Sequence, residues 1–222
     1  MSSTFDTVVL DIDGTLVDSN YQHAVAWFRA FRRFDVTPSV WRIHRAIGMG
    51  GDRLVGEVAG DEVEDEHGDE IRTAWEEEFA PYLPEIRPVD GARALLEHLH
   101  ERGCVIVLAS SGKSAHVDHY LDLLDARPLA DAWTTSADAE QTKPAPDLVT
   151  TALDRVGHGA AVMVGDSTWD VVAARTIGLD THCLLTGGFS AAELAEAGAV
   201  AVHENLDALW STLDPLLTSR RR

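Results

Sequence analysis

The stretch Thr7–Ser19, TVVLDIDGTLVDS, joins a short apolar run to two carboxylates and a sharp turn. Residues 8–10 are β-branched or aliphatic, which is typical of a strand buried on both faces. Asp11 ends this run, and ligands of open parallel α/β sheets bind beyond the carboxyl ends of the strands. Asp13 follows two residues later, and Gly14 lets the chain turn away sharply. The stretch therefore predicts a parallel α/β sheet with a polar pocket at the end of its first strand.

Asp11 and Asp13 place two carboxylates near each other at this strand end. Their repulsion is relieved when a divalent cation lies between them or when one of them keeps a proton. Either arrangement serves phosphoryl transfer, in which charge on the phosphate must be neutralised. The alternative, a pair of solvated turn aspartates, is common for an isolated Asp-x-Asp. The buried strand and the glycine turn favour a catalytic pair.

The segment from Tyr21 to Pro84 shows no strand pattern, and its apolar residues recur at helical spacing. Helices are predicted at residues 21–34, 40–47, 53–59 and 69–80. The acidic run 61–66 is predicted to be a solvated turn between the last two helices. Pro81, Pro84 and Pro88 follow and predict a hinge. A helical bundle is the natural packing for such a segment.

From Asp90 onward, helical and strand patterns alternate. Strands are predicted at residues 104–109, 133–135, 161–165, 181–185 and 199–202, and helices at 91–102, 115–124, 146–156, 168–177, 191–197 and 206–217. Repeated βα units of this length imply a doubly wound parallel sheet, which is a Rossmann-like α/β core. We therefore expect a catalytic core in residues 1–20 and 85–222, with an inserted helical-bundle cap domain in residues 21–84.

Ser110, Ser111 and Gly112 follow the second predicted strand. A glycine turn before a helix offers backbone amides suited to an anionic oxygen. An ordinary turn that caps the next helix has the same pattern. The triplet taken alone leaves both interpretations open.

Lys143 begins the sequence KPAPD, in which two prolines restrict the backbone and hold the lysine in a loop. The chain has 18 basic residues, and only Lys113 and Lys143 are lysines. A compact ammonium group used this sparingly suggests a specific need for it. A rigidly held ammonium can neutralise charge that builds up on a phosphate. A surface lysine beside prolines is the alternative.

Asp166 ends the predicted strand 161–165, and Asp170 lies about one helical turn further on. Together with Asp11 and the backbone carbonyl of Asp13, these residues supply oxygen ligands but leave the shell incomplete. Mg²⁺ prefers such a shell, because it retains water molecules and binds substrate phosphates. Asp166 or Ser167 also fits the role of a helix cap, which does not exclude metal binding.

The formal net charge of −19 opposes binding to nucleic acid or to anionic lipid. No apolar run approaches the ~20 residues that cross a membrane, and the first residues do not resemble a signal peptide. We therefore expect a cytoplasmic protein. Cys104 and Cys183 lie in apolar runs and are predicted to be buried, reduced thiols. The basic tail 220–222 is predicted to be solvated.

The run D-x-D-G-T-L-x-D-S resembles the first motif of the haloacid-dehalogenase-like hydrolase superfamily, and the serine, lysine and aspartate sites resemble its second, third and fourth motifs in order. The helical insert after the first motif resembles the branch that contains phosphoglycolate phosphatase and β-phosphoglucomutase. The resemblance implies that Asp11 is a nucleophile that attacks phosphorus. It also implies that Asp13 is a general acid and base that binds Mg²⁺ through its carbonyl.

The remaining roles follow from the same resemblance. Ser110 and the amide of Ser111 would hold phosphate, Lys143 would brace Asp11, and Asp166 and Asp170 would bind Mg²⁺ directly or through water. The candidate residues are Asp11, Asp13 and Lys143 for catalysis, Asp11, Asp13, Asp166 and Asp170 for the metal, and Gly14, Thr15, Ser110, Ser111, Gly112 and His23 for the substrate. The implied function is Mg²⁺-dependent hydrolysis of a small phosphorylated metabolite through an aspartyl-phosphate, by a monomer or homodimer.

Other functions fit the motifs less well. A dehalogenase needs neither an acid nor a metal, so Asp13, Asp166 and Asp170 argue against that activity. A phosphorylatable signalling module, such as a response-regulator receiver, also uses Asp, Mg²⁺ and Lys, but it lacks the helical insert and the D-x-D-G-T run. A non-catalytic binding protein would not need every reactive position to be filled.

A phosphosugar mutase of the β-phosphoglucomutase type is the main alternative. Its helix after the first motif has a histidine five residues beyond the final Asp, and His23 stands at that distance from Asp18. Such a mutase also needs a cap arginine to hold a second phosphate. Near the expected position this chain has Asp52, with Arg53 as the nearby cation. An acidic residue would repel a second phosphate, so the sequence favours hydrolysis of a monophosphate.

Overall fold

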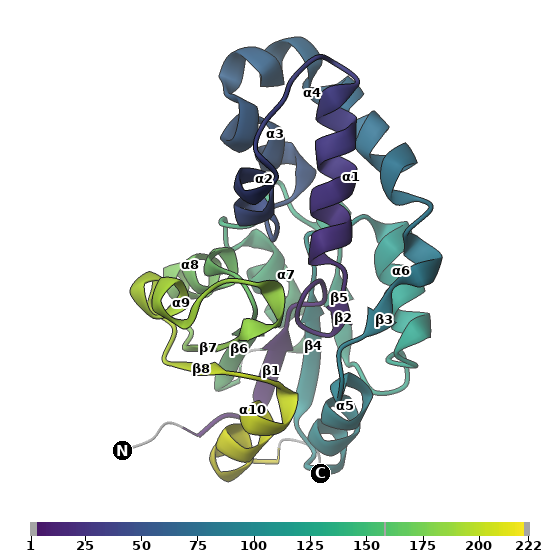
Figure 1. The fold of residues 1–222 in the computed structure, drawn as a ribbon. Helices are drawn as coiled ribbons and strands as arrows, with labels where there is room; N and C mark the ends of the chain where they lie inside the picture. Colours follow the sequence, from purple (N-terminus) through teal and green to yellow (C-terminus); the bar gives the residue numbers. More distant parts are fainter. Residues whose placement is uncertain (1–3, 158, 220–222) are drawn as a thin grey trace.

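Six parallel strands form the central sheet, in the order β5-β4-β1-β6-β7-β8 (Figure 1). This computed structural model describes residues 4–157 and 159–219, so the basic tail 220–222 lies outside the described residues. The strands are β1 (Thr7–Leu10), β4 (Val105–Ala109), β5 (Ala132–Thr134), β6 (Ala161–Gly165), β7 (Thr181–Leu184) and β8 (Ala201–His203). The apolar β1 is paired on both sides, with β4 and β6. The predicted doubly wound α/β core is confirmed.

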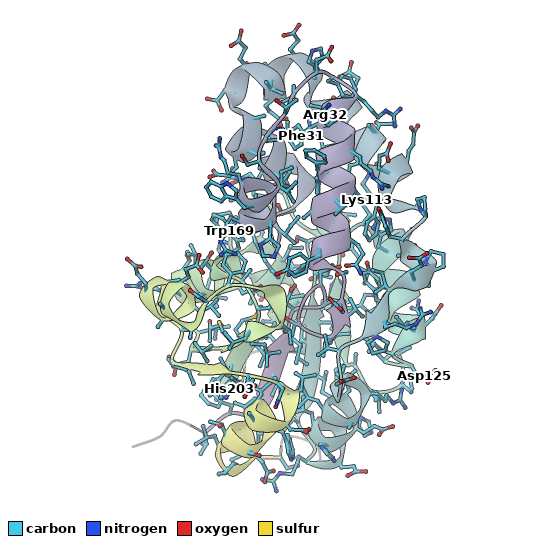
Figure 2. All side chains as sticks on the ribbon, in the orientation of Figure 1. Phe31, Arg32, Lys113, Asp125, Trp169 and His203 are labelled. Carbon is cyan, nitrogen blue, oxygen red and sulfur yellow. The ribbon has the colours of Figure 1, made fainter. Side chains whose placement is uncertain are left out.

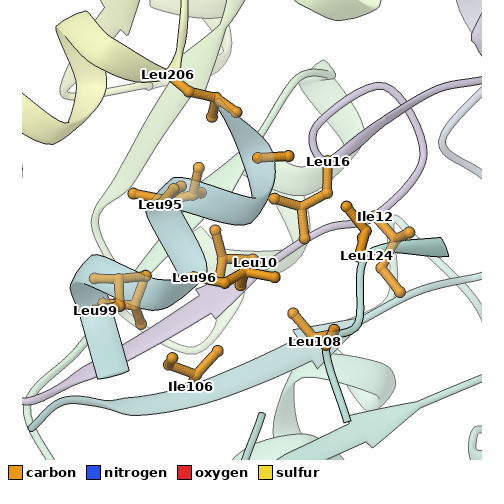
Figure 3. Close-up of a cluster of buried hydrophobic side chains, with 14 of the residues drawn as sticks. Leu10, Ile12, Leu16, Leu95, Leu96, Leu99, Ile106, Leu108, Leu124 and Leu206 are labelled. Carbon is orange, nitrogen blue, oxygen red and sulfur yellow. The ribbon is translucent and has the colours of Figure 1, made fainter. Parts of the chain in front are cut away.

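Helices cover both faces of the sheet (Figure 1). One hydrophobic cluster involves α5 (Ala92–Glu101), α6 (Ser114–Leu123) and α10 (Leu206–Leu213), and the helices of the other face are α7 (Asp147–Val156), α8 (Thr168–Thr176) and α9 (Ala191–Ala197). Side chains alternate along β1, so Val8 and Leu10 pack in the first cluster and Val9 packs in the second. Figure 3 shows Leu10 and Leu96 within the first cluster. These two clusters fix β1, and therefore the position of Asp11.

Four helices form a cap that is inserted between β2 (Val17–Asp18) and β3 (Arg87–Pro88), an antiparallel pair. They are α1 (Asn20–Arg32), α2 (Val40–Ala46), α3 (Gly51–Ala59) and α4 (Asp61–Phe79). The cap has a hydrophobic core of its own, in which the rings of Trp27 and Trp75 stack with centroids 4.9 Å apart. The predicted helical insert is therefore confirmed. The domain boundary at residues 21–84 remains a proposal.

The predicted turn in the acidic run 61–66 is wrong, because these residues form the first turns of α4. Gly60, with a φ of 92°, alone separates α3 from α4. Its positive φ lets the chain reverse without a longer loop. Carboxylates in the first turn of α4 are stabilised by the positive end of the helix dipole. The charge pattern alone did not reveal that a helix begins there.

The last helix also ends earlier than the predicted residue 217. α10 stops at Leu213, and Pro215 lies in a short 3₁₀ helix that follows. Proline is tolerated in a first turn but interrupts helical hydrogen bonding further along. The 3₁₀ helices are η1 (Leu83–Glu85), η2 (Ser136–Asp138), η3 (Leu185–Gly187) and η4 (Asp214–Leu216).

Two further predictions concern membrane segments and thiols. Within the described part of the chain, no helix combines the length and the apolarity that a membrane crossing requires. Cys104 and Cys183 are both buried and are not joined in a disulfide within the described residues, as predicted.

Candidate active site

Three neighbouring strands end in polar side chains at the same edge of the sheet. Asp11 follows β1, Ser110 follows β4 and Asp166 follows β6. All three residues are buried, and Asp11 is only 4% exposed. The carboxyl ends of parallel strands lie together, so residues more than 150 positions apart in sequence meet at one site.

A buried charged cluster lies at this edge. Asp11, Asp166 and Asp170 can each present a carboxylate oxygen within 4.8 Å of the others. Lys143 is fully buried, forms an ion pair with Asp11, and places its Nζ 2.7 Å from Asp170 Oδ1. Asp13 was assigned to the metal through its backbone carbonyl, and its carboxylate lies outside this cluster. Lys143 is thus a core residue of the site rather than a surface lysine.

The carboxylates of the cluster are electrostatically unfavourable without a further cation. Burial raises the pKa of Asp11, and the charges of Asp170 and Asp166 add to this rise against the attraction of Lys143. Burial and the charge of Asp170 raise the pKa of Asp166 to about 7. Burial would lower the pKa of Lys143, but the charges of Asp11 and Asp170 raise it. The three buried carboxylates carry more negative charge than the single ammonium group of Lys143 can balance. Such a set of oxygen donors fits Mg²⁺.

Asp166 is oriented by the residues that follow β1. Thr15 Oγ1 donates to Asp166 Oδ1 at 2.8 Å, and Asn20 Nδ2 donates to Asp166 Oδ2 at 2.8 Å. Gly14 has a φ of +76°, and a Cβ there would lie 2.4 Å from Asp166 Oδ2. Gly14 and Thr15 were predicted to bind substrate, but the structure places them against Asp166. Sequence reasoning missed Asn20, which begins α1 directly after the first motif.

Asp170 has two roles in the structure. Ser167 is the N-cap of α8, where its amide donates to Asp170 Oδ2 at 3.1 Å and its hydroxyl donates to the same oxygen at 2.6 Å. The helix-cap interpretation of Ser167 is therefore confirmed. Because Oδ2 is occupied in this way, Oδ1 is the oxygen that lies against Lys143.

Asp13 is held from the cap side. Ser19 Oγ donates to Asp13 Oδ1 at 2.6 Å, and His23 Nε2 lies 3.0 Å from the same oxygen. Burial opposes ionisation of Asp13, but the hydrogen bonds from His23 and Ser19 and the charge of His23 lower its pKa. The His23 ring is itself fixed, since it stacks on Phe79 with centroids 3.9 Å apart. His23 therefore orients the carboxylate that was assigned to acid–base chemistry.

The loop after β4 differs in detail from the prediction. The Gly112 amide was expected to be free for an anion, but it donates to Ser110 Oγ at 2.9 Å. Ser111 Oγ donates to the carbonyl of Gly48 at 3.0 Å and so joins the core to the cap. Residues 110–112 therefore form a turn as well as a candidate phosphate loop. Binding of phosphate by the amide of Ser111 stays a prediction.

Two adjoining cavities lie where the cap meets the core. The inner cavity, of about 50 Å³, is lined by Asp11, Asp13, His23 and the Gly112 turn. The outer cavity, of about 250 Å³, shares lining residues with the inner one. The shared residues are Gly51, Trp75 and Ser111, and those lining only the outer cavity include Asp52, Arg72, Lys113, Ser136, Glu140 and Thr142. Figure 2 shows Lys113 at the level where the cap meets the core. The arrangement gives a reacting group and a larger attached group separate spaces.

Sequence reasoning missed several residues of the outer cavity. Thr142 Oγ1 accepts from the Gly50 amide at 2.9 Å and donates to Asp52 Oδ1 at 2.5 Å, across about ninety residues. Arg53 was named as the nearby cation, but among the described residues it lines neither cavity, whereas Arg72 lines the outer one. Only the proximity of Thr142 to the KPAPD motif could have drawn attention to it.

A family model described as haloacid dehalogenase-like hydrolase matches residues 5–178. The chain belongs to this family. It is similar to a phosphoglycolate phosphatase of Pseudomonas fluorescens, with 30% identity over 215 residues, which are 91% of this chain and 77% of the relative. It is also similar to a validoxylamine A 7'-phosphate phosphatase of Streptomyces hygroscopicus subsp. limoneus, with 28% identity over 218 residues, which are 95% and 99% of the two chains.

The solved structures agree with this assignment. A hydrolase from Pseudomonas syringae has a TM-score of 0.89 and 30% identity, covering 96% of this chain and 99% of that one. The helical cap between the first strand and the rest of the core is that of the phosphoglycolate-phosphatase-like branch of the family. The fold is also similar to that of a putative β-phosphoglucomutase from Bacteroides vulgatus, with a TM-score of 0.85 and 23% identity, covering 97% of this chain and 91% of that one. The chain is a hydrolase of phosphate esters and acts on small phosphorylated compounds.

Proposed function

We propose that this chain is a Mg²⁺-dependent phosphatase that hydrolyses a small phosphorylated metabolite through an aspartyl-phosphate on Asp11. One observation carries the proposal: Asp11 and Asp13 line the same cavity, with Asp11 paired to the fully buried Lys143. This arrangement presents a carboxylate nucleophile and a second, separately held carboxylate to one bound phosphate.

The carboxylates of Asp11, Asp166 and Asp170, with the carbonyl of Asp13, would hold Mg²⁺. Mg²⁺ when bound would supply positive charge to a phosphate oxygen and so reduce its repulsion from the nucleophile. Thr15 and Asn20 hold Asp166 in place for this role through their two 2.8 Å hydrogen bonds. These residues therefore bind and orient rather than react.

In the first step, Asp11 attacks phosphorus and the bond to the leaving oxygen breaks. Lys143 remains beside Asp11 and balances the charge that moves onto the phosphoryl group. Asp13 supplies a proton to the leaving oxygen. Its lowered pKa would leave it ionised alone, but His23 Nε2 lies 3.0 Å from it, and this pair can hold the proton that the leaving oxygen takes.

In the second step, Asp13 removes a proton from water, which attacks phosphorus in line and regenerates Asp11. An ionised Asp13 suits this step, and the hydrogen bond from Ser19 keeps its carboxylate in place. The same carboxylate therefore acts as an acid and then as a base.

The mutase alternative is less well supported by the outer cavity. Asp52 and Glu140 line the space that a second phosphate would occupy, and Arg72 is already bound to Glu64. Incubation with β-glucose 1-phosphate, Mg²⁺ and a trace of the bisphosphate separates the two activities. We expect release of inorganic phosphate rather than glucose 6-phosphate.

We also propose that residues 21–84 form a cap domain and that the protein is cytoplasmic.

Asp11→Asn tests the nucleophile. The amide cannot form the acyl phosphate, so phosphate release from p-nitrophenyl phosphate and from a panel of metabolite esters should fall to background while the fold is retained. Asp18→Asn, which changes an exposed carboxylate of the same motif, is the matched control and should keep its activity. Removing divalent cations with a chelator should abolish wild-type turnover, and added Mg²⁺ should restore it. Wild-type rates in Asp11→Asn, or steady turnover without divalent ions, would overturn the proposal.

A further inference from the structure

The two cations of the outer cavity are already bound to carboxylates of the cap. Arg72 Nη2 lies 2.8 Å from Glu64 Oε1 and 2.9 Å from Asp69 Oδ1. Lys113 forms an ion pair with Glu76. Three carboxylates thus surround two cations, so neither cation is left to attract an anionic substituent.

Two further carboxylates line the same cavity without a cation. Asp52 accepts hydrogen bonds from the hydroxyl and the amide of Thr142, at 2.5 and 3.3 Å. Asp52 and Glu140 form no ion pair within the described residues 4–157 and 159–219. The outer cavity is therefore negative overall, in a chain whose net charge is −19.

The remaining lining of the cavity is aromatic and hydroxylic. Trp75 lines both cavities with the 7% of its surface that is exposed, and its ring stacks with Trp27 at a centroid distance of 4.9 Å and with His23 and Phe79 at 5.6 Å. Ser136 and Thr142 bring hydroxyl groups to the outer cavity. Carboxylates and hydroxyls accept hydrogen bonds from hydroxyl groups, and an aromatic ring packs against the C–H face of a cyclic compound.

We propose that the leaving group of this phosphatase is a hydroxyl-rich ring compound without negative charge, such as a sugar or cyclitol, and that a protonated amino group on it improves binding. This inference rests on the proposed phosphatase activity and adds the class of substrate. A carboxylate or a second phosphate in the outer cavity would meet Asp52 and Glu140 without a free cation, and uncompensated like charge weakens binding. A hydroxyl or ammonium group donates to the same carboxylates.

Three esters that share a phosphate position test the proposal. We expect kcat/KM to rank glucosamine 6-phosphate first, glucose 6-phosphate second and 6-phosphogluconate last, with a difference of about tenfold or more between the last two. Hydrolysis of p-nitrophenyl phosphate, measured in parallel, reports whether the catalytic residues are intact. A rate for 6-phosphogluconate equal to or above that for glucose 6-phosphate would overturn the proposal, as would turnover of p-nitrophenyl phosphate with none of the three sugar esters.

Charge-neutralising variants connect the preference to the cavity. Glu140→Gln and Asp52→Asn should each reduce the discrimination against 6-phosphogluconate by about threefold, a modest effect because both residues are exposed to solvent. Glu140→Gln is the cleaner variant, because Asp52 also binds Thr142 beside the catalytic lysine. Glu77→Gln, on the same helix as Arg72 but paired with Arg33, is the matched control and should leave the ratio unchanged. An unchanged ratio in Glu140→Gln and Asp52→Asn would also contradict the proposal.

The two proposals fail in different ways. Absence of phosphate release from every ester, p-nitrophenyl phosphate included, would refute the proposed function and with it the substrate class. Release from p-nitrophenyl phosphate with a preference for anionic esters would leave the phosphatase standing and refute only the substrate class.

Discussion

Lys113 lines the outer cavity, whereas Lys143 lies behind Asp11, which lines the inner cavity, so the two lysines are held in different surroundings. Lys143 is fully buried and contacts Asp11 and Asp170. The side chain of Lys113 is 45% exposed and contacts only Glu76 among ion-pair partners of the described residues. Charge interactions are strong in a buried site and weak at a solvated one. The inner cavity can therefore stabilise a reacting phosphate, while the outer one can only bias which leaving group enters.

Exchanging each lysine for methionine should give the largest contrast. Lys143→Met removes the ammonium beside the nucleophile, so we expect activity on p-nitrophenyl phosphate to fall by about 10²-fold or more. It also leaves Asp11 and Asp170 without their buried partner, which destabilises by about 3–5 kcal/mol. Lys113→Met should change activity less than about threefold and stability by less than about 1 kcal/mol. Initial rates measure the effect on activity, and thermal unfolding measures the effect on stability. Similar effects of the two variants would show that burial does not distinguish the two lysines.

Thr142 connects the two cavities, since it precedes Lys143 and binds Gly50 and Asp52 of the cap. Thr142→Val keeps the size of the side chain and removes both hydrogen bonds. We expect a loss of about 1–2 kcal/mol in the free energy of unfolding and a rise in KM of several-fold, with a smaller change in kcat. Thr212→Val, on an exposed turn of α10, is the control. A fall in kcat with KM unchanged would indicate that Thr142 acts on Lys143 alone.

A buried pair of histidines lies away from both cavities and, unlike Lys143, has no close carboxylate partner among the described residues. His182 Nδ1 lies 3.0 Å from His203 Nε2, and burial together with the charge of His203 lowers the pKa of His182 to about 4, against a smaller opposing effect of Asp180. A base whose pKa falls on folding takes up its proton more readily when unfolded, so stability is full above about pH 6.5 and is lost as the pH falls toward 4.

We expect protonation of this pair to lower the free energy of unfolding by on the order of 1–2 kcal/mol when the pH falls from 7 to 4.5. Urea unfolding of His182→Asn over this pH range should show a shallower acid dependence than the wild type. The exposed His98→Asn should show the wild-type dependence. An identical slope in His182→Asn and the wild type would mean that other groups cause the acid loss.

Much of the fold could be predicted from local pattern. The apolar run of β1, the glycine turn and the alternation after Asp90 are short-range features, and each produced the element that the structure contains. The acidic run 61–66 failed because charge pattern does not distinguish a solvated turn from a solvated helix start. The predicted C-terminal end of α10 at residue 217 was wrong, because Pro215 interrupts an otherwise helical pattern, whereas the predicted start at residue 206 is confirmed.

The residues of the site also fall into two groups: those that stand in a local sequence motif, and those whose contacts depend on tertiary packing. Asp11, Asp13, Lys143 and Asp166 stand in motifs, and the structure brings them to one edge of the sheet. The contacts of Thr142 with Asp52, and the pairing of Arg72 with Glu64, depend on how the cap packs on the core and have no local pattern. The hydrogen bond of Thr15 to Asp166, 151 residues away, has no local pattern either, and the predicted contact of Thr15 with substrate stays a prediction.

The proposed reaction passes the phosphoryl group through Asp11, and the variant Asp13→Asn can trap it there. p-Nitrophenolate leaves without needing a proton, so this variant can still complete the first step with p-nitrophenyl phosphate. It lacks the base that deprotonates water for the second step, so a phosphoenzyme should accumulate. Rapid acid quenching followed by mass spectrometry of the digested protein should place the phosphate on Asp11, in a form cleaved by hydroxylamine. Phosphate on another residue, or continued turnover by Asp13→Asn at the wild-type rate with no phosphoenzyme, would show that Asp11 is not the nucleophile.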